Sequence, residues 1–416
     1  MLRKYFGRIQ TVYAEFPQQF WVVVAVSFID RIGGTLLFPF FALYITQRFE
    51  VGMTTAGIIL GLFSVFGLIG GFLGGALADK FGRRSIILFG LVFSAVTTLA
   101  LGFVTELNML YPLAIFIGTL SSIAGPAHGA LIADLLPENK RQEGFGILRV
   151  VANLSWLIGP TIGGFFASRD FMILFIADAA ISSIVAILFA LFIRESQSAQ
   201  VHEKEQGESI INTLKGYVLV IQDKAFTAFI LASVIVGFVY LQMYNTLSVY
   251  LRDQHGINAQ GYGLLMSTSA ITVILFQFSV SRLIKYRPPF QMLMVGSLFY
   301  ALGFALFGVF GALWLFALNV VIITIGEMIH MPTMQALTAE FAPEEMRGRY
   351  MAVFDLTWAI PAAIGPGLAG FIIDNYDPNL LWYGGGLLCV MAAILFLGLH
   401  GNIGKQDRFL PKPVSD

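Results

Sequence analysis

Long runs of apolar residues, separated by short polar stretches, follow one another along the whole chain. A helix needs about 20 residues to cross about 30 Å of hydrocarbon, and each run has about that length. We predict twelve membrane-spanning helices, at residues 20–47, 54–78, 85–104, 108–136, 144–167, 171–193, 227–250, 261–284, 291–310, 312–340, 350–373 and 380–400. The pattern therefore predicts an all-α membrane protein.

Composition supports this interpretation. Of 416 residues, 57% are hydrophobic and 12% are charged, which leaves too little polar surface to cover a soluble globule. The first run is too long for a removable signal peptide and lacks the small-residue cleavage pattern, so we expect it to be retained as a span.

The two halves of the chain repeat each other at an offset of 206 positions. The identical pairs include Pro126 and Pro332, Arg141 and Arg347, Gly159 and Gly365, Pro160 and Pro366, and Gly164 and Gly370. A doubled membrane unit has a pseudo-symmetric seam, and transporters bind cargo and ions there. We expect two pseudo-symmetric six-helix bundles at 1–194 and 226–416. A polar linker at 195–225 would join them, and its part from Ile210 to Ile221 could lie on the membrane surface as an amphipathic helix.

The basic residues are distributed unevenly, although the formal net charge is zero. The termini and every second loop hold 20 Lys and Arg residues, whereas the opposite loops hold 3. Because cytoplasmic loops carry the excess of Lys and Arg, this asymmetry predicts that both termini are cytoplasmic.

The loop after the second span combines glycines with charges: Gly75, Asp79, Gly82, Arg83 and Arg84. The glycines allow close helix approach and a tight reversal. Asp79 could face the positive N-terminus of a neighbouring helix, and Arg83 needs an acidic partner. We expect that partner to be Asp134, at the end of the fourth span.

This loop resembles the signature loop of the major facilitator superfamily, Gly-x-x-x-Asp-Arg-x-Gly-Arg-Arg, with Lys80 where Arg is usual. The resemblance covers the whole chain and implies the family's fold of two six-helix bundles. It also implies that Asp79, Arg83 and Asp134 form a cytoplasmic charge latch that holds the outward-open state.

The fifth span contains Gly146, Ser155 and then Gly159-Pro160-Thr161-Ile162-Gly163-Gly164. This is similar to the antiporter signature Gly-x8-Gly-x3-Gly-Pro-x-x-Gly-Gly, with Ser155 in place of the second glycine. In the family that motif marks drug–proton antiporters. Small-residue packing is the alternative, and the repeated Gly365, Pro366 and Gly370 favour it. Family antiporters often carry an arginine in the fourth span, but Ile117 to Gly125 contains none, so proton exchange would use other groups.

Several ionisable residues fall inside predicted spans, where each costs about 2.5–3.5 kcal/mol and normally faces a cavity or a partner. The candidates for proton coupling are Asp30, Arg31, Arg149, Glu327 and Asp355. We hypothesise that Asp30 and Glu327 include the carboxylate that carries the proton, with Arg31 or Arg149 as the resident cation. A static Asp30–Arg149 ion pair is the alternative.

The resemblance implies that spans one, four, seven and ten surround the central cavity. The candidates for cargo contact are Gln242, Tyr244 and Asn245 in span seven, with Asn153, Trp156, Gln277, His330 and Trp358 elsewhere. Aromatic walls with a few polar groups suit hydrophobic or amphipathic cargo.

These observations predict a secondary active transporter in a bacterial inner membrane, and they favour a proton-coupled exporter of hydrophobic or amphipathic small molecules. We expect a monomer in the lipid bilayer, with no cofactor, metal or nucleic acid. The chain lacks the Gly-x-x-x-x-Gly-Lys-Ser/Thr motif of ATP-driven pumps. An importer or uniporter of a polar solute, or a lipid transporter, stays possible on this fold. An intramembrane enzyme is disfavoured, because neither Gly-x-Ser-x-Gly nor His-Glu-x-x-His occurs.

Overall fold

The computed structural model describes residues 13, 15–193, 217–404 and 409. Most of the predicted linker at 195–225 lies outside the described residues, as does most of the amphipathic helix expected at 210–221. Within the described part, residues 217–222 are helical.

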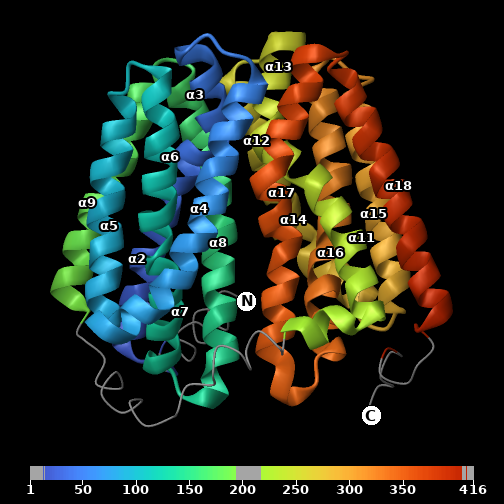
Figure 1. Ribbon diagram of the computed structural model, residues 1–416, viewed down its shortest axis with the longest axis horizontal. Coiled ribbons are helices and arrows are strands. Elements are labelled where there is room, and N and C mark those ends of the chain that lie inside the picture. Colours follow the sequence, from blue (N-terminus) through green and yellow to red (C-terminus); the bar gives the residue numbers. More distant parts are fainter. Residues whose placement is uncertain (1–12, 14, 194–216, 405–408, 410–416) are drawn as a thin grey trace, which may run out of the picture. The chain divides into compact units, whose positions relative to one another are not determined.

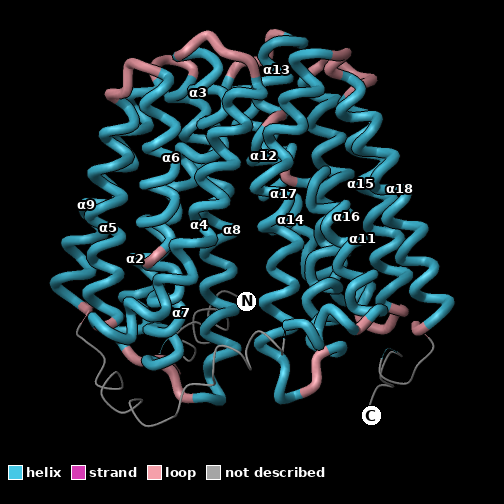
Figure 2. The backbone as a smooth tube through the Cα atoms, viewed as in Figure 1, coloured by secondary structure: helices cyan, strands magenta, loops and turns pink. Residues whose placement is uncertain are grey.

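The described residues contain twelve helices that are long and apolar enough to cross a membrane, which confirms the predicted all-α membrane fold. The tube drawing shows helices joined by short loops, and no strand occurs in the described part of the chain (Figure 2). Contacts divide the chain into two compact units, Met1–Phe38 with Val65–Gln206 and Pro39–Ser64 with Gly207–Asp416. The division predicted from the sequence lies at the linker between the two repeats. The division by contacts differs from it because residues 39–64 pack with the C-terminal helices.

The first unit is a bundle of helices (Figure 1). Buried apolar side chains from several of these helices pack together in its core. Its helices are α2 (Gln18–Leu37), α4 (Met53–Phe81) from Val65 onward, α5 (Arg83–Gly102), α6 (Leu107–Ser122), α7 (Ala124–Leu135), α8 (Glu138–Ala167) and α9 (Phe171–Phe192). Helix α2 packs against α8 and α9, and α5 packs against α9. Phe20, Leu131 and Val185 from three of these helices are completely buried in the core.

The second unit holds the C-terminal helices together with residues 39–64. Its elements are most of η1 (Phe38–Phe40), then α3 (Phe41–Arg48), the start of α4, α11 (Lys224–Tyr240), α12 (Gln242–Asn245), α13 (Leu247–His255), α14 (Ala259–Ile284), α15 (Pro289–Phe307), α16 (Leu313–Phe341), η4 (Glu344–Met346), α17 (Arg347–Asn375) and α18 (Asn379–Asn402). Helix α15 packs against α16 and α18, and α11 packs against α17 and α18.

The 206-residue repeat is preserved in the positions where helices begin. Five elements of the first repeat start 206 residues before their counterparts: Gln18 and Lys224, Met53 and Ala259, Arg83 and Pro289, Leu107 and Leu313, and Glu138 and Glu344. The last pair, Phe171 and Asn379, differs by two more residues. The two repeats therefore have the same helical plan.

Three spans that the apolar pattern predicts as continuous are interrupted. The first changes to a short 3-10 turn at Phe38–Phe40, where Pro39 cannot donate a backbone hydrogen bond. The fourth is divided between Ser122 and Ala124, and the seventh is divided at Leu241. Such breaks let one membrane span present backbone and side chains in two directions.

Candidate functional site

A carboxylate lies among phenol groups in the interior of the second unit. Tyr240 ends α11 and Tyr244 lies on α12, and their hydroxyl groups are 3.0 Å apart. The carboxylate of Glu327, on α16, interacts electrostatically with Tyr240, Tyr244 and Tyr300. Hydroxyl groups can donate hydrogen bonds to a carboxylate or accept one from a carboxylic acid, so this cluster suits a group that changes protonation state. We call Tyr240, Tyr244, Tyr300 and Glu327 the Glu327 cluster.

Aromatic rings pack within the Glu327 cluster and against it. Trp358 of α17 meets Tyr240 edge to face, with ring centroids 5.9 Å apart. Within the cluster, the ring centroids of Tyr300 and Tyr240 are 5.7 Å apart. Tyr240 and Tyr300 were not among the residues predicted from the sequence. The position of Tyr240 one helical turn before Tyr244 was the signal that could have identified it.

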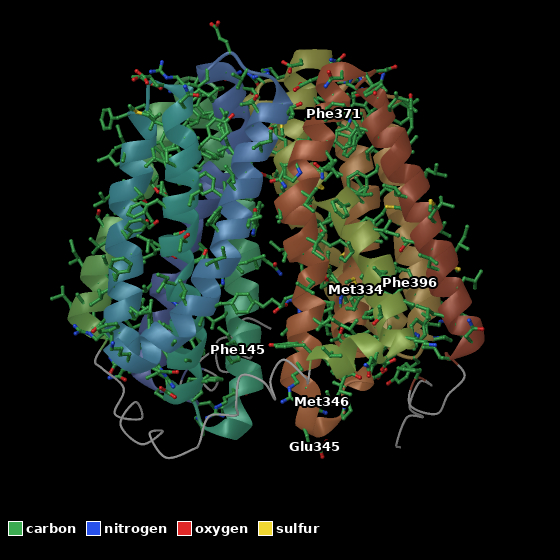
Figure 3. All side chains as sticks on the ribbon, in the orientation of Figure 1. Phe145, Met334, Glu345, Met346, Phe371 and Phe396 are labelled. Atoms are coloured by element: carbon green, nitrogen blue, oxygen red, sulfur yellow. The ribbon has the colours of Figure 1, made fainter. Side chains whose placement is uncertain are left out.

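His330 follows Glu327 by three residues but occupies a different environment. Its side chain is fully buried, and its ring lies 5.6 Å from Tyr300 and 5.6 Å from Phe396, which Figure 3 labels. Neither ring nitrogen has a hydrogen-bond partner among the described residues. This surrounding favours a packing role for His330 over cargo contact.

The predicted polar residues of span seven are buried. Gln242 donates to the Phe238 carbonyl at 2.8 Å and accepts from the Thr246 hydroxyl at 2.7 Å, so its amide is satisfied within its own segment. Asn245 is also buried. An apolar cavity of about 310 Å³ lies beside Gln242, between α11, α17 and α18.

Gln277 belongs to α14 and reaches α16. It donates to the Ser281 hydroxyl at 3.0 Å and to the Met328 carbonyl at 3.4 Å. The side chain therefore contacts the backbone next to Glu327.

The first unit contains a second group of intramembrane charges. Asp30 is half-buried on α2, and Arg31 is exposed. The two side chains interact electrostatically, although the described residues contain no ion pair between them. His128 of α7 shares a 3.0 Å hydrogen bond with Ser27, one turn before Arg31. Asp178, buried on α9, interacts electrostatically with Asp30. Asp178, which was not among the residues predicted from the sequence, therefore belongs to the same group of charges as Asp30.

The remaining candidates of this group lie on exposed positions. Arg149 and Asn153 are exposed on α8, and Asp355 is exposed on α17. Trp156 is half-buried on α8. Their coupling and cargo roles stay predictions.

The loop between α4 and α5 is held to its own unit by its arginines. Arg83 forms an ion pair with Asp134, and its guanidinium also donates to the Ala130 carbonyl at 2.9 Å. Arg84 donates to the carbonyls of Ile193 and Ala190 at 2.6 and 2.7 Å. The Arg83–Asp134 contact expected from the sequence is therefore present.

The other members of the loop motif differ in what constrains them. Gly82 has a φ of 85°, a left-handed conformation that glycine adopts without strain. Asp79 is exposed, and the described residues of its unit give it no ion pair. The role of Asp79, Arg83 and Asp134 as a latch stays a prediction.

The glycine–proline motif of α8 makes a contact within the first unit. A Cβ atom on Gly159 would overlap the side chain of Thr35 on α2, so the two helices touch there. Gly163 and Gly164 are buried, whereas Gly146 has open space around it. At the repeated position, a Cβ atom on Gly365 would lie 2.9 Å from Gln242 Nε2 on α12. This symmetry favours the packing interpretation of Gly159, and the antiporter interpretation stays a prediction.

Metal binding has no support in the described residues, which contain no group of three or more His, Cys, Asp or Glu side chains able to hold an ion. Cys389 is buried in α18.

Twelve spans in two equivalent repeats, with carboxylates inside the spans, define a polytopic membrane protein of the secondary transporter class. The family model for the Major Facilitator Superfamily matches residues 23–366 and 242–413. The chain belongs to this superfamily and is an integral, multi-pass membrane protein.

Similar proteins cover most of the chain. A Na⁺, Li⁺, K⁺/H⁺ antiporter from Planococcus maritimus is 26% identical over 359 residues, which are 80% of this chain and 84% of that protein. A class H tetracycline resistance protein from Pasteurella multocida is 25% identical over 383 residues, 90% of this chain and 94% of that protein. A solved POT family transporter in complex with a thioalcohol-conjugated peptide matches with a TM-score of 0.79 and 20% identity, covering 94% of this chain and 97% of that one.

Proposed function

We propose that this superfamily member is a proton-coupled exporter of hydrophobic or amphipathic small molecules. The observation that carries the proposal is the position of Glu327, which lies inside a membrane-spanning helix among the phenols of Tyr240, Tyr244 and Tyr300. A carboxylate inside a membrane span is energetically costly, so it normally pairs with another group or marks a functional site. The similarity to a tetracycline resistance protein supports a drug-like cargo, and resistance to such a compound is consistent with its export.

In this proposal, Glu327 and Asp30 bind and release the coupling proton as water enters and leaves their surroundings. Tyr244 and Trp358 supply aromatic surface to the cargo, and Gln277 reaches the backbone beside Glu327. The basic residues at the termini and in alternate loops support an orientation with both ends in the cytoplasm of a bacterial cell.

A second candidate function is exchange of Na⁺, Li⁺ or K⁺ for protons. Similarity to the Planococcus antiporter favours it, and a carboxylate among hydroxyl groups offers the oxygen atoms that hard cations prefer. The same carboxylate would then bind a cation or a proton in turn.

Everted membrane vesicles with an imposed pH gradient test both candidates. The gradient is followed with a fluorescent amine while either a hydrophobic cationic dye or NaCl and KCl are added. Dye that discharges the gradient and accumulates until an uncoupler is added supports the exporter. Discharge by salt alone supports cation exchange, and accumulation that is insensitive to the uncoupler contradicts both.

A pair of matched variants tests the carboxylate. Glu327→Gln should abolish uphill accumulation and keep downhill exchange of cargo, because the amide cannot carry a proton. Glu106→Gln alters an exposed glutamate before α6 whose side chain makes no capping hydrogen bond, so it should behave as wild type. Unchanged uphill transport by Glu327→Gln would remove this residue from the mechanism.

A further inference from the structure

The first turn of α4 is capped by a residue that is remote in the sequence. Asp374, at the end of α17, accepts hydrogen bonds from the backbone N–H of Met53 at 2.9 Å and of Thr54 at 2.8 Å. It also accepts one from the Thr54 hydroxyl at 2.6 Å. A helix N-terminus carries unpaired N–H groups and positive potential, so a carboxylate is a favourable partner for it.

The repeat shows what is unusual about this cap. Helix α14 begins 206 residues after α4 and is capped locally, because Asn258 accepts from the Gly261 N–H at 3.1 Å. The matching residue before α4 is Gly52, which has no side chain that could cap. The first repeat therefore takes from α17 the cap that the second repeat makes for itself.

Glycine at position 52 also makes room for the carboxylate. A Cβ atom on Gly52 would overlap Asp374 Oδ2. Farther along α4, Cβ atoms on Gly57 and Gly61 would overlap the carbonyl oxygens of Pro366 and Ala363 on α17. The two helices are thus in close backbone contact between Thr54 and Gly61 of α4, with Asp374 at the end of the contact.

A second polar contact joins the same parts of the chain. Arg252, on α13, donates to the Thr46 hydroxyl on α3 at 2.9 Å. Residues 39–64 therefore belong to the first repeat by sequence and to the second unit by packing, and polar bonds hold them at both α3 and α4.

These bonds have the properties of a contact that can open. Asp374 is exposed and Thr54 is half-buried, so water can replace each hydrogen bond when the partners separate. At the glycine positions the two helices meet through backbone atoms, so these points of contact do not depend on interlocked side chains.

We propose that Asp374 is the positioning residue of a releasable latch, which holds the start of α4 against α17 and opens in each transport cycle. This inference rests on the proposed function, because alternating access requires the two repeats to separate at this end. Asp374 contacts neither cargo nor proton in this role. It sets how much of the time the two helix ends stay together.

Spin-label distances test the latch in the full-length protein. Gln47→Cys and Tyr376→Cys place labels on exposed sites of α3 and at the end of α17, in a Cys389→Ala background that removes the single native thiol. Wild type should show mainly the short distance. Asp374→Ala should raise the ratio of the long to the short population about five- to tenfold, the effect of losing one helix cap.

Two further variants separate the latch from helix stability. Asp374→Ala combined with Gly52→Asn gives α4 a local cap like that of α14, so the helix start is restored and the long distance should persist. Asp377→Ala removes another exposed aspartate in the same region, which accepts a hydrogen bond from the Asn379 N–H, and should leave the distances unchanged.

The proposal is overturned if Asp374→Ala gives the wild-type distances, or if Asp377→Ala produces the same shift. It is also overturned if the restored cap returns the short distance. This measurement uses neither cargo nor a proton gradient. If the distances change as expected but the protein transports no cargo, the proposed function is refuted, whereas the contact between Asp374 and the start of α4 is supported.

Discussion

Gly159 on α8 and Thr35 on α2 are in direct contact, because a Cβ atom on the glycine would overlap the threonine side chain. The Thr35 hydroxyl donates to the Ser155 carbonyl at 3.1 Å, one turn away. The glycine–proline motif of α8 thus has a specific packing partner inside the first unit.

Enlarging this glycine should destabilise the first unit. We expect Gly159→Ala to lower the free energy of unfolding by about 1–3 kcal/mol, since overpacking forces side chains and backbone to shift. The measurement is thermal unfolding of the purified protein in detergent. Gly146→Ala is the control, because a Cβ atom there meets nothing within 4 Å. Equal melting temperatures for the two variants would contradict the assignment.

The Arg83–Asp134 ion pair should contribute to the stability of the fold, in addition to the role predicted for it in the cytoplasmic charge latch. Both side chains are 13% exposed, so we expect Arg83→Ala to cost about 1.5–3 kcal/mol, the range for hydrogen bonds to charged groups. Asp79→Asn should leave the melting temperature unchanged, since Asp79 has no ion pair in the described part of its unit. If Arg83→Ala and Asp134→Ala add without coupling in a double-mutant cycle, the pair does not stabilise the fold.

Trp358 should affect cargo affinity more than stability. Its half-buried ring lies edge to face against Tyr240 of the Glu327 cluster, where we expect it to contact the cargo. An aromatic contact contributes about 0.5–1.5 kcal/mol to the free energy of binding. We therefore expect Trp358→Ala to weaken binding of a hydrophobic dye about three- to tenfold in fluorescence titration. Trp314→Ala, at a position that is 70% exposed, should bind the dye as wild type does. Equal affinities for both variants would place the cargo elsewhere.

His255 should make the second unit less stable in acid. It ends α13, outside the membrane-spanning helices, and its ring packs against Tyr250 and Phe316. Burial lowers the pKa of His255 below its usual value of 6.5. As the pH falls below that value, the unfolded chain takes up the proton first, so the folded state loses stability until the pH passes the folded pKa.

Comparison with His255→Gln isolates this effect. Unfolding of both proteins is measured between pH 8 and pH 5, and wild type should lose stability relative to the variant below pH 6.5. Parallel curves across this range would show that His255 does not contribute.

The positions of the helices could be predicted because two independent signals indicate them: the length of each apolar run and the 206-residue repeat. Both signals place the second span near Met53 and its counterpart near Ala259, where the structure begins α4 and α14. Hydrophobicity does not report a break, however, since Pro39 and Leu241 are as apolar as a continuous span requires. Those breaks depend on tertiary contacts that no local pattern contains.

The candidate site was predictable only in part, for a related reason. Glu327 is recognisable because a charge in an apolar run is rare, and Arg83 and Asp134 because their motif requires a partner. Tyr300 is one of 14 tyrosines in an aromatic-rich chain, and only the packing of α15 against α16 brings it to Glu327. Asp374 falls just after the predicted span 350–373, and no local pattern marks it, because its partner Thr54 is 320 residues away.

The crossing of residues 39–64 from one repeat to the other unit determines how the chain could be divided. A polypeptide cut in the linker would yield fragments that do not correspond to the packed units, because the N-terminal piece would carry residues 39–64, which pack with the C-terminal unit. Co-expressed fragments are therefore expected to associate through this segment. Each repeat carries the same helical plan, but a single repeat does not by itself contain a complete packed unit.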